Sequence, residues 1–122
     1  MIISQHELAD FLKEANKNSY ANENTKKVPS TRLGSEDYHF EKNDLIYHDT
    51  YFGSEKFIGN SIVYKNAQSV WGMNYYGIPL SPNKDSELIY KFLRKALVQD
   101  YSDIIPVRGP KIFQDDEWQY LN

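Results

Sequence analysis

The chain has 122 residues, enough for one domain with a single core, and its content of 40% hydrophobic and 25% charged residues is typical of folded soluble proteins. A formal net charge of −3 and a pI near 5.6 argue against DNA or RNA held along a broad basic face. Because the chain has no cysteine, disulfides, thiolate metal sites and cysteine nucleophiles are excluded.

The sequence predicts neither a membrane-spanning segment nor a secretion signal. No apolar run approaches the roughly 20 residues of a membrane span. The opening MIISQHELADF also lacks the basic region of a secretion signal. We therefore expect no membrane partner and a cytoplasmic location.

The first segment predicts a helix over residues 5–15. Ser4 and Glu7 form a capping box, and apolar residues follow at helical spacing at Leu8, Phe11, Leu12 and Ala15. This stripe is narrow, so we expect residues 1–17 to dock on a second copy of the chain and make a homo-oligomer, at least a dimer. The asparagine-rich residues 16–25 predict a loop.

The middle of the chain predicts an antiparallel meander. Apolar and polar residues alternate over residues 36–41, 45–52, 57–64 and 69–76, with turn residues between these runs. In the last run one face is strongly aromatic, whereas the other carries an amide and a glycine. We expect one face of the sheet to pack against the core and the other to be able to hold a ligand.

The last third predicts a helix and one more strand. A wide apolar stripe begins near Lys84 and includes Leu88, Phe92 and Ala96, so this helix is expected to be the main cover of the sheet. Residues 112–121 predict a short strand. The fold class is then α+β in a single domain, 1–122, with a twisted antiparallel sheet of about five strands and the sheet and core helix within 36–121.

Metal and phosphate-loop sites are not indicated by the sequence. His6, His39 and His48 are scattered, and no pair has helical or strand spacing with a carboxylate that would complete a metal shell. No glycine-rich loop of the GxGxxG or GxxxxGK type is present. We expect neither a metal nor a cofactor.

Several carboxylates could in principle supply a general acid and base. They are Asp49, Asp115, Asp116 and Glu117. Acidic residues at turns and strand ends are more often solvated than catalytic. We therefore expect a protein that is not an enzyme, and keep a nucleotide hydrolase using Asp49 or Asp115 as the base as an alternative.

Two arginines in constrained loops suggest a site for a small anion. Arg32 lies in PSTRLGS and Arg108 in VRGPK, where proline and glycine restrict the backbone. A guanidinium can grip a phosphate bidentately. Hydroxyls of Ser30 and Thr31 would add donors, and Lys111 would add a flanking charge. Gly109, next to Arg108 in the constrained loop, is counted with the site.

The aromatic strands could supply the rest of that site. Phe52, Tyr75 and Tyr76 are candidates to stack on a base, although such residues are more often core. Asn74 and Asp49 are candidates to bond ribose hydroxyls or a base edge. We expect these residues to meet the two loop arginines in one site.

The motifs SVWGMNYYG, YHDTYFGSEKFIGNS, PSTRLGS and VRGPK resemble a small bacterial domain family of unknown function, some of whose members follow a helix-turn-helix. The length and the opening MIISQHELADFLKEANKNSYA also resemble the phage sponges that counter Thoeris defence. Members of the bacterial family continue past the RGP loop into further strands. This chain ends at Asn122, so any site residue supplied there would be missing or replaced.

The resemblance implies a phage protein in the host cytoplasm. It would bind a cyclic ADP-ribose isomer made by a bacterial TIR enzyme and sequester it without cleavage. It also implies a symmetric oligomer with ligand between subunits, and admits a second site for cyclic oligonucleotides. Besides the hydrolase, a ligand-sensing module of a transcriptional regulator remains an alternative, although no DNA-binding segment is evident in the sequence.

Overall fold

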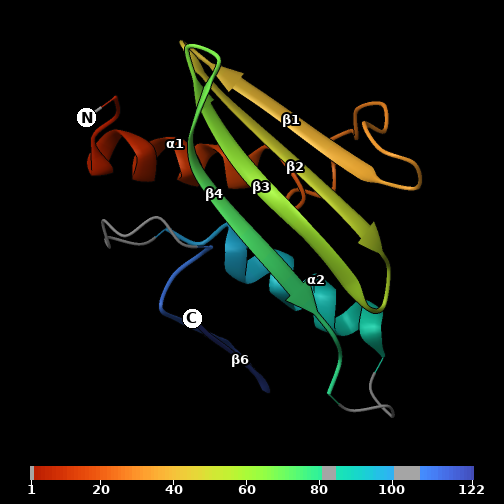
Figure 1. Cartoon of the computed structure of the whole chain (residues 1–122). Coiled ribbons are helices and arrows are strands. Elements are labelled where there is room, and N and C mark those ends of the chain that lie inside the picture. The colour runs from red at the N-terminus through yellow and green to blue at the C-terminus, as the bar shows by residue number, and fades with distance from the viewer. Residues whose placement is uncertain (1, 81–84, 101–107) are drawn as a thin grey trace.

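The computed structural model describes residues 2–80, 85–100 and 108–122 (Figure 1). It has two helices and six strands within these ranges. Their bounds are α1 Gln5–Lys17, β1 Glu36–Lys42, β2 Leu45–Gly53, β3 Phe57–Lys65, β4 Gln68–Gly77, α2 Ser86–Leu97, β5 Ile112–Asp115 and β6 Trp118–Leu121. The expected α+β class is confirmed.

The main sheet has four antiparallel strands in the order β1-β2-β3-β4, not five. The tail, expected to add a strand, instead folds into its own two-stranded sheet, β5-β6. Asp116 turns this hairpin with a φ of 46°. The hairpin stays apart because its aromatic residues pack on α2, where Phe92 stacks on Phe113 and Trp118 with ring centroids 5.7 and 5.9 Å apart.

Helix α1 covers the sheet of its own chain. The Ser4 hydroxyl accepts a hydrogen bond from the Glu7 amide at 3.1 Å, as the capping box predicts. The apolar stripe is buried in one cluster with sheet residues, comprising Ile3, Leu8, Phe11, Leu12, Ala15, Leu45, Tyr47 and Val63. The apolar stripe of this helix therefore packs on the sheet of its own chain, whereas docking of residues 1–17 on a second copy stays a prediction.

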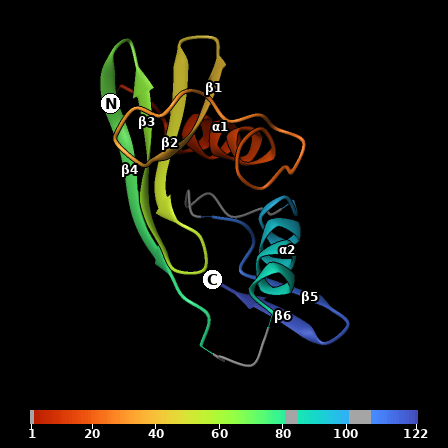
Figure 2. The same ribbon diagram turned by 90° about the vertical axis from the view of Figure 1, so that its right-hand side faces the viewer.

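Helix α2 contributes less to the core than expected. The Asp85 side chain caps the N-terminus of α2 by accepting a hydrogen bond from the Glu87 amide. The expected start near Lys84 falls outside the described residues. Only Ala96 and Leu97 of this helix are buried. The prediction of α2 as the main core helix is wrong, because Phe92 of its stripe packs on the β5-β6 hairpin and Leu88 is exposed. Both helices lie on the same side of the sheet (Figure 2).

The strand register assigns every side chain to one of two faces. The inner face, toward the helices, carries Tyr47, Asp49 and Tyr75. The outer face, on the other side, carries the neighbouring positions in the strands, such as His48 and Tyr76. Within the part of the chain that the structure describes, neither helix is long and apolar enough to cross a bilayer.

Candidate functional site

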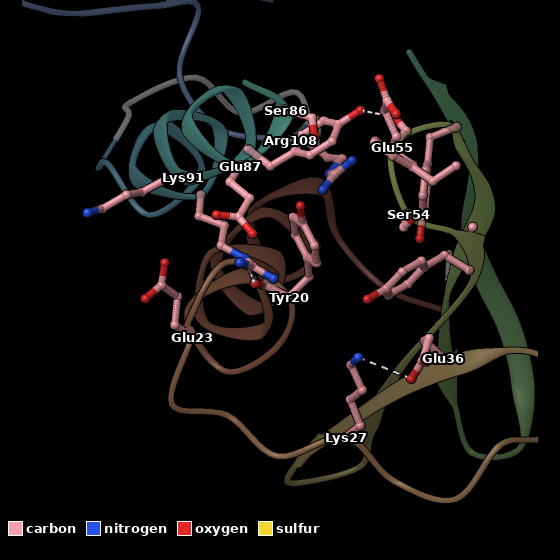
Figure 3. A pocket seen from close by; sticks show the side chains of 16 residues that line it. Tyr20, Glu23, Lys27, Glu36, Ser54, Glu55, Ser86, Glu87, Lys91 and Arg108 are labelled. Carbon is pink, nitrogen blue, oxygen red and sulfur yellow. Dashed lines mark hydrogen bonds and ion pairs between the residues drawn. The ribbon is translucent and has the colours of Figure 1, made fainter. Parts of the chain in front are cut away.

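A cleft of about 710 Å³ opens between the inner face of the sheet, the segment after α1 and helix α2 (Figure 3). Its size is in the range of small-molecule sites. The lining residues are Tyr20, Glu23, Lys27, Glu36, Tyr51, Gly53, Ser54, Glu55, Phe57, Tyr75, Ser86, Glu87, Tyr90, Lys91, Arg94 and Arg108. We call this space the cleft.

Aromatic rings form much of the cleft wall. Tyr20 contacts Tyr51 edge to face, with ring centroids 5.9 Å apart. Phe57 contacts both Tyr75, at 5.9 Å, and Tyr90, at 5.4 Å. The Tyr90 hydroxyl also donates to the backbone oxygen of Glu55. These contacts join helix α2 to the end of the sheet, and so define one mouth of the cleft.

Two guanidinium groups lie on tyrosine rings in the cleft. The Arg94 guanidinium carbon is 4.4 Å from the centroid of Tyr20, and its Nε donates to the Tyr20 carbonyl at 3.0 Å. The Arg108 guanidinium carbon is 5.0 Å from the centroid of Tyr75. Figure 3 shows the Arg108 side chain pointing into the cleft close to Tyr20. The cleft thus holds two cations whose positions are fixed by aromatic contacts.

The backbone at Arg108 is held by the C-terminal hairpin. Its carbonyl accepts hydrogen bonds from the Tyr120 hydroxyl and from the Asn122 side-chain amide, the latter at 2.9 Å. Gly109 follows with a φ of 76°, where an added Cβ would lie 3.1 Å from the Tyr120 hydroxyl. Glycine is therefore favoured there for conformational and steric reasons. This agrees with the expected constrained loop.

Charges of both signs line the cleft. Among the basic residues of the lining, Lys27 pairs with Glu36 at 3.1 Å and Lys91 is a further cation. Arg94 and Arg108 are the cations with aromatic ring contacts. Acidic side chains at Glu23, Glu55 and Glu87 also face this space. An anion would therefore be recognised by the placement of the guanidiniums and not by an overall positive field.

Asp49 lies beneath the cleft wall. It is buried, and its Oδ1 accepts hydrogen bonds from the Tyr75 hydroxyl at 2.7 Å and from Ser61 at 2.9 Å. Burial raises the pKa of Asp49 despite these hydrogen bonds, and burial together with the Asp49 charge raises the pKa of Tyr75 strongly. Burial also raises the pKa of Tyr47, which bonds Ser61, to about 12. Asp49 thus orients Tyr75 and does not itself line the cleft.

The second predicted arginine lies on the other side of the sheet. The Arg32 guanidinium carbon is 5.2 Å from the ring centroid of Phe52 on the outer face. There it borders a hollow of about 600 Å³, lined by Arg32, Thr50, Phe52, Ile58, Gly59, Asn60, Asn74, Tyr75 and Tyr76. The sheet separates Arg32 from Arg108, so the structure does not bring the predicted residues into one site. The reason is strand alternation, which sends Tyr75 and Tyr76 to opposite faces.

The hydroxyls expected beside Arg32 are used inside their own loop. Ser30 donates to the Ser35 carbonyl at 2.5 Å, and Thr31 donates to Asp37 at 2.6 Å. Lys111, expected as a flanking charge, is exposed and is not among the residues that line the cleft. These three residues therefore have no place in the cleft.

Sequence reasoning missed Tyr20, Tyr90 and Arg94. Tyr90 and Arg94 are four residues apart and so share one face of α2, a pattern that could have been found. Tyr20 comes from a loop with no periodicity, and nothing in the sequence places it opposite α2.

The histidines are not all scattered, as expected from the sequence. His39 and His48 are direct partners across β1 and β2. The two-residue connection at Asn43 and Asp44 sets this register and could have predicted the pairing.

No curated protein and no solved structure matches this chain. Residues 49–122 match a family described as a domain of unknown function, DUF5680. The matched stretch contains Tyr75, Tyr90, Arg94 and Arg108 of the cleft, and leaves out Tyr20. Since this stretch makes up more than half of the chain, the protein belongs to the DUF5680 family.

Proposed function

We propose that the protein binds a small nucleotide with a pyrophosphate, of the cyclic ADP-ribose class, in the cleft and holds it without cleaving it. The observation that carries this proposal is the pair of guanidiniums, Arg94 and Arg108, placed on tyrosine rings in a cleft of about 710 Å³. In this role the protein is a phage sponge that removes the signal of a bacterial TIR enzyme, as its resemblance to Thoeris anti-defence proteins implies.

The chemistry of the cleft suits such a ligand. A cyclic ADP-ribose carries two negative charges, and guanidiniums pair with phosphate oxygens through bidentate hydrogen bonds. Tyr20 and Tyr75 present rings beside those cations. Stacking of one base on an aromatic ring contributes about 1 to 3 kcal/mol. Cations and stacking surfaces therefore lie within the reach of one nucleotide.

The surroundings of Asp115 and Asp49, the two candidate general bases, favour sequestration over hydrolysis. Asp115 forms an ion pair with Lys95 on the surface. Asp49 is buried behind Tyr75 and accepts two hydrogen bonds. The raised pKa of Asp49 is nevertheless a property found in general acids, so a nucleotide hydrolase remains the second candidate.

Calorimetry on the purified protein with cyclic ADP-ribose isomers tests the proposal. A sponge must outcompete an effector, so we expect a Kd near or below about 10 nM for the preferred isomer. Loss of one charge-assisted contact costs about 1.5 to 3 kcal/mol, so Arg94→Ala and Arg108→Ala should each weaken binding roughly tenfold to more than a hundredfold. Arg32→Ala on the outer face is the matched control.

Two outcomes would redirect the proposal. Equal affinity in wild type, Arg94→Ala and Arg108→Ala would show that the cleft is not the site, and a loss confined to Arg32→Ala would move the site to the outer face. Heat denaturation of the loaded protein should return the nucleotide intact. Recovery of ADP-ribose or AMP, with turnover under excess substrate, would identify a hydrolase.

The proposal includes a homo-oligomer and a second site. For cyclic oligonucleotides we propose the hollow of about 600 Å³ on the outer face of the sheet, which is lined by Arg32, Phe52, Asn74 and Tyr76 among others. Titration of Arg32→Ala with a cyclic dinucleotide or trinucleotide tests that placement. Light scattering with and without ligand tests whether the protein is at least a dimer.

A further inference from the structure

Two histidines face each other on the outer face of the sheet, away from the cleft. His39 of β1 and His48 of β2 are direct cross-strand partners, and these strands are neighbours in Figure 1. Their Nδ1 atoms are 3.0 Å apart. The rings are inclined by 65°, with centroids 5.3 Å apart. The close contact between two ring nitrogens requires an explanation.

The other nitrogen of each ring is held by a carboxylate. His48 Nε2 is 2.6 Å from Asp37, and His39 Nε2 is 2.9 Å from Glu41. A carboxylate accepts hydrogen bonds, so each Nε2 carries its hydrogen and each Nδ1 is left to face the other. Imidazoles that bind metals have this arrangement, in which the second nitrogen donates to a carboxylate that fixes the ring.

The support behind His48 is rigid. Asp37 is fully buried and lies within hydrogen-bond distance of Thr31, Ser35 and Thr50 as well as of His48. Three fixed donors therefore hold the carboxylate that orients the ring. His39, by contrast, has about a third of its side chain exposed and has room to adjust.

We propose that His39 and His48 form a site for a divalent transition metal, Zn²⁺, Ni²⁺ or Cu²⁺, bound through both Nδ1 atoms. Imidazole is a preferred ligand for these ions. With metal–nitrogen bonds of about 2.0 to 2.1 Å, two ligands lie about 2.9 Å apart at a right angle and about 3.3 to 3.4 Å apart in a tetrahedron. The contact of 3.0 Å falls between these values.

A bound ion would lie between the two Nδ1 atoms, each of which must present its lone pair to the metal. A small rotation of His39 would direct both lone pairs at an ion lying off the line between the nitrogens.

The remaining coordination positions would be filled by water. The two rings border a hollow of about 440 Å³ on the outer face, where the polar side chains of Thr31, Thr50 and Asn60 are also part of the lining. In the described ranges no group of three or more His, Cys, Asp or Glu side chains converges to form a fuller shell. With two protein ligands, the site should bind metal less tightly than a structural zinc site and leave positions open to exogenous ligands.

Calorimetry of the untagged protein with ZnCl₂ and NiCl₂ tests this proposal. We expect one ion per chain in the wild type and a loss of more than tenfold in affinity in His39→Ala. Glu41→Gln, which alters only the carboxylate behind His39, should weaken binding about 10 to 100-fold. His6→Ala is the matched control and should bind like the wild type, because His6 is exposed on α1, which packs on the opposite face of the sheet from this pair.

Electron paramagnetic resonance with one equivalent of Cu²⁺ gives a second readout, in which hyperfine structure from two nitrogens is expected. Circular dichroism of His39→Ala verifies the fold, and His48→Ala is avoided because His48 bonds the buried Asp37. No stoichiometric binding by the wild type, unchanged binding by His39→Ala, or loss of binding in His6→Ala would each overturn the proposal. None of these results depends on the proposed nucleotide function.

Discussion

Two buried aspartates make a paired prediction, because their surroundings have opposite effects on a carboxylate. Asp37 lies within hydrogen-bond distance of five donor groups, namely the Thr31 amide and hydroxyl, the Ser35 and Thr50 hydroxyls and His48 Nε2. Burial alone would raise the pKa of Asp37, but these hydrogen bonds outweigh it and hold the pKa far below its ordinary value. For Asp49 burial prevails, and the pKa is raised.

Asp37→Asn should be strongly destabilising. Asp37 Oδ1 faces two donors and Oδ2 faces three, so whichever oxygen becomes an amide nitrogen, at least one donor loses its acceptor, since only the Ser35 hydroxyl can turn to the Arg32 carbonyl. Each unsatisfied buried group costs about 1 to 3 kcal/mol, and the loss of a buried charge partner adds to it, so we expect about 3 to 5 kcal/mol in total.

Asp49→Asn should differ by less than about 1 kcal/mol from wild type at neutral pH, or be more stable. Both of its donors, the hydroxyls of Ser61 and Tyr75, meet Oδ1, and an amide oxygen accepts them equally well. The substitution also removes a carboxylate whose ionised form is disfavoured by burial.

Urea unfolding followed by tryptophan fluorescence measures both variants. With an m value of about 1 to 3 kcal/mol/M, the Asp37→Asn midpoint should fall by more than about 1 M, while the Asp49→Asn midpoint stays close to wild type. Similar losses in the two variants, or a larger loss in Asp49→Asn, would refute the assignment of opposite roles.

Three further predictions concern stability. Because its folded pKa is depressed, Asp37 contributes stability that is present above about pH 4 and lost as pH falls below it, so the wild-type urea midpoint should drop in acid more than that of Asp37→Asn. Leu12→Ala should cost about 2 to 5 kcal/mol in thermal or urea unfolding, whereas Leu88→Ala should cost less than about 0.5 kcal/mol, because Leu12 is 2% and Leu88 55% exposed; equal losses would mean that α1 does not form the core. Gly59→Ala would place a Cβ 2.4 Å from a backbone oxygen of β2 and should cost about 1 to 3 kcal/mol. The nearest atom to a Cβ at Gly72 is a side-chain methyl at 3.1 Å, so Gly72→Ala should cost less when both are compared by unfolding midpoint.

The strands could be predicted from the sequence because their signal is local. A period of two placed all four strands of the main sheet within two residues of their observed bounds. The packing partners of the helices could not be predicted in the same way. The stripe of α2 is wide enough to cover a sheet, but whether it meets the sheet or a hairpin depends on the fold of residues more than ten positions away.

The candidate site was predicted in part. Arg108 and Tyr75 do lie together, and the glycine after Arg108 does adopt a positive φ that favours glycine. Tyr75 and Tyr76 do not form one surface, because adjacent side chains of a strand point to opposite faces of the sheet. Tyr20 reaches the cleft through a loop whose course is fixed by tertiary contacts, such as the hydrogen bond from Arg94 to its carbonyl.

The boundary of the family match has a consequence for relatives of this protein. The match begins at residue 49, within β2, so it leaves out helix α1 and strand β1, although α1 buries Val63 of β3 in the core. A protein that shares only the matched stretch needs a different element over that apolar surface. The two cleft arginines lie inside the match and Tyr20 lies outside it. Such a relative can therefore keep the two arginines while a different residue takes the place of Tyr20, the ring on which Arg94 lies.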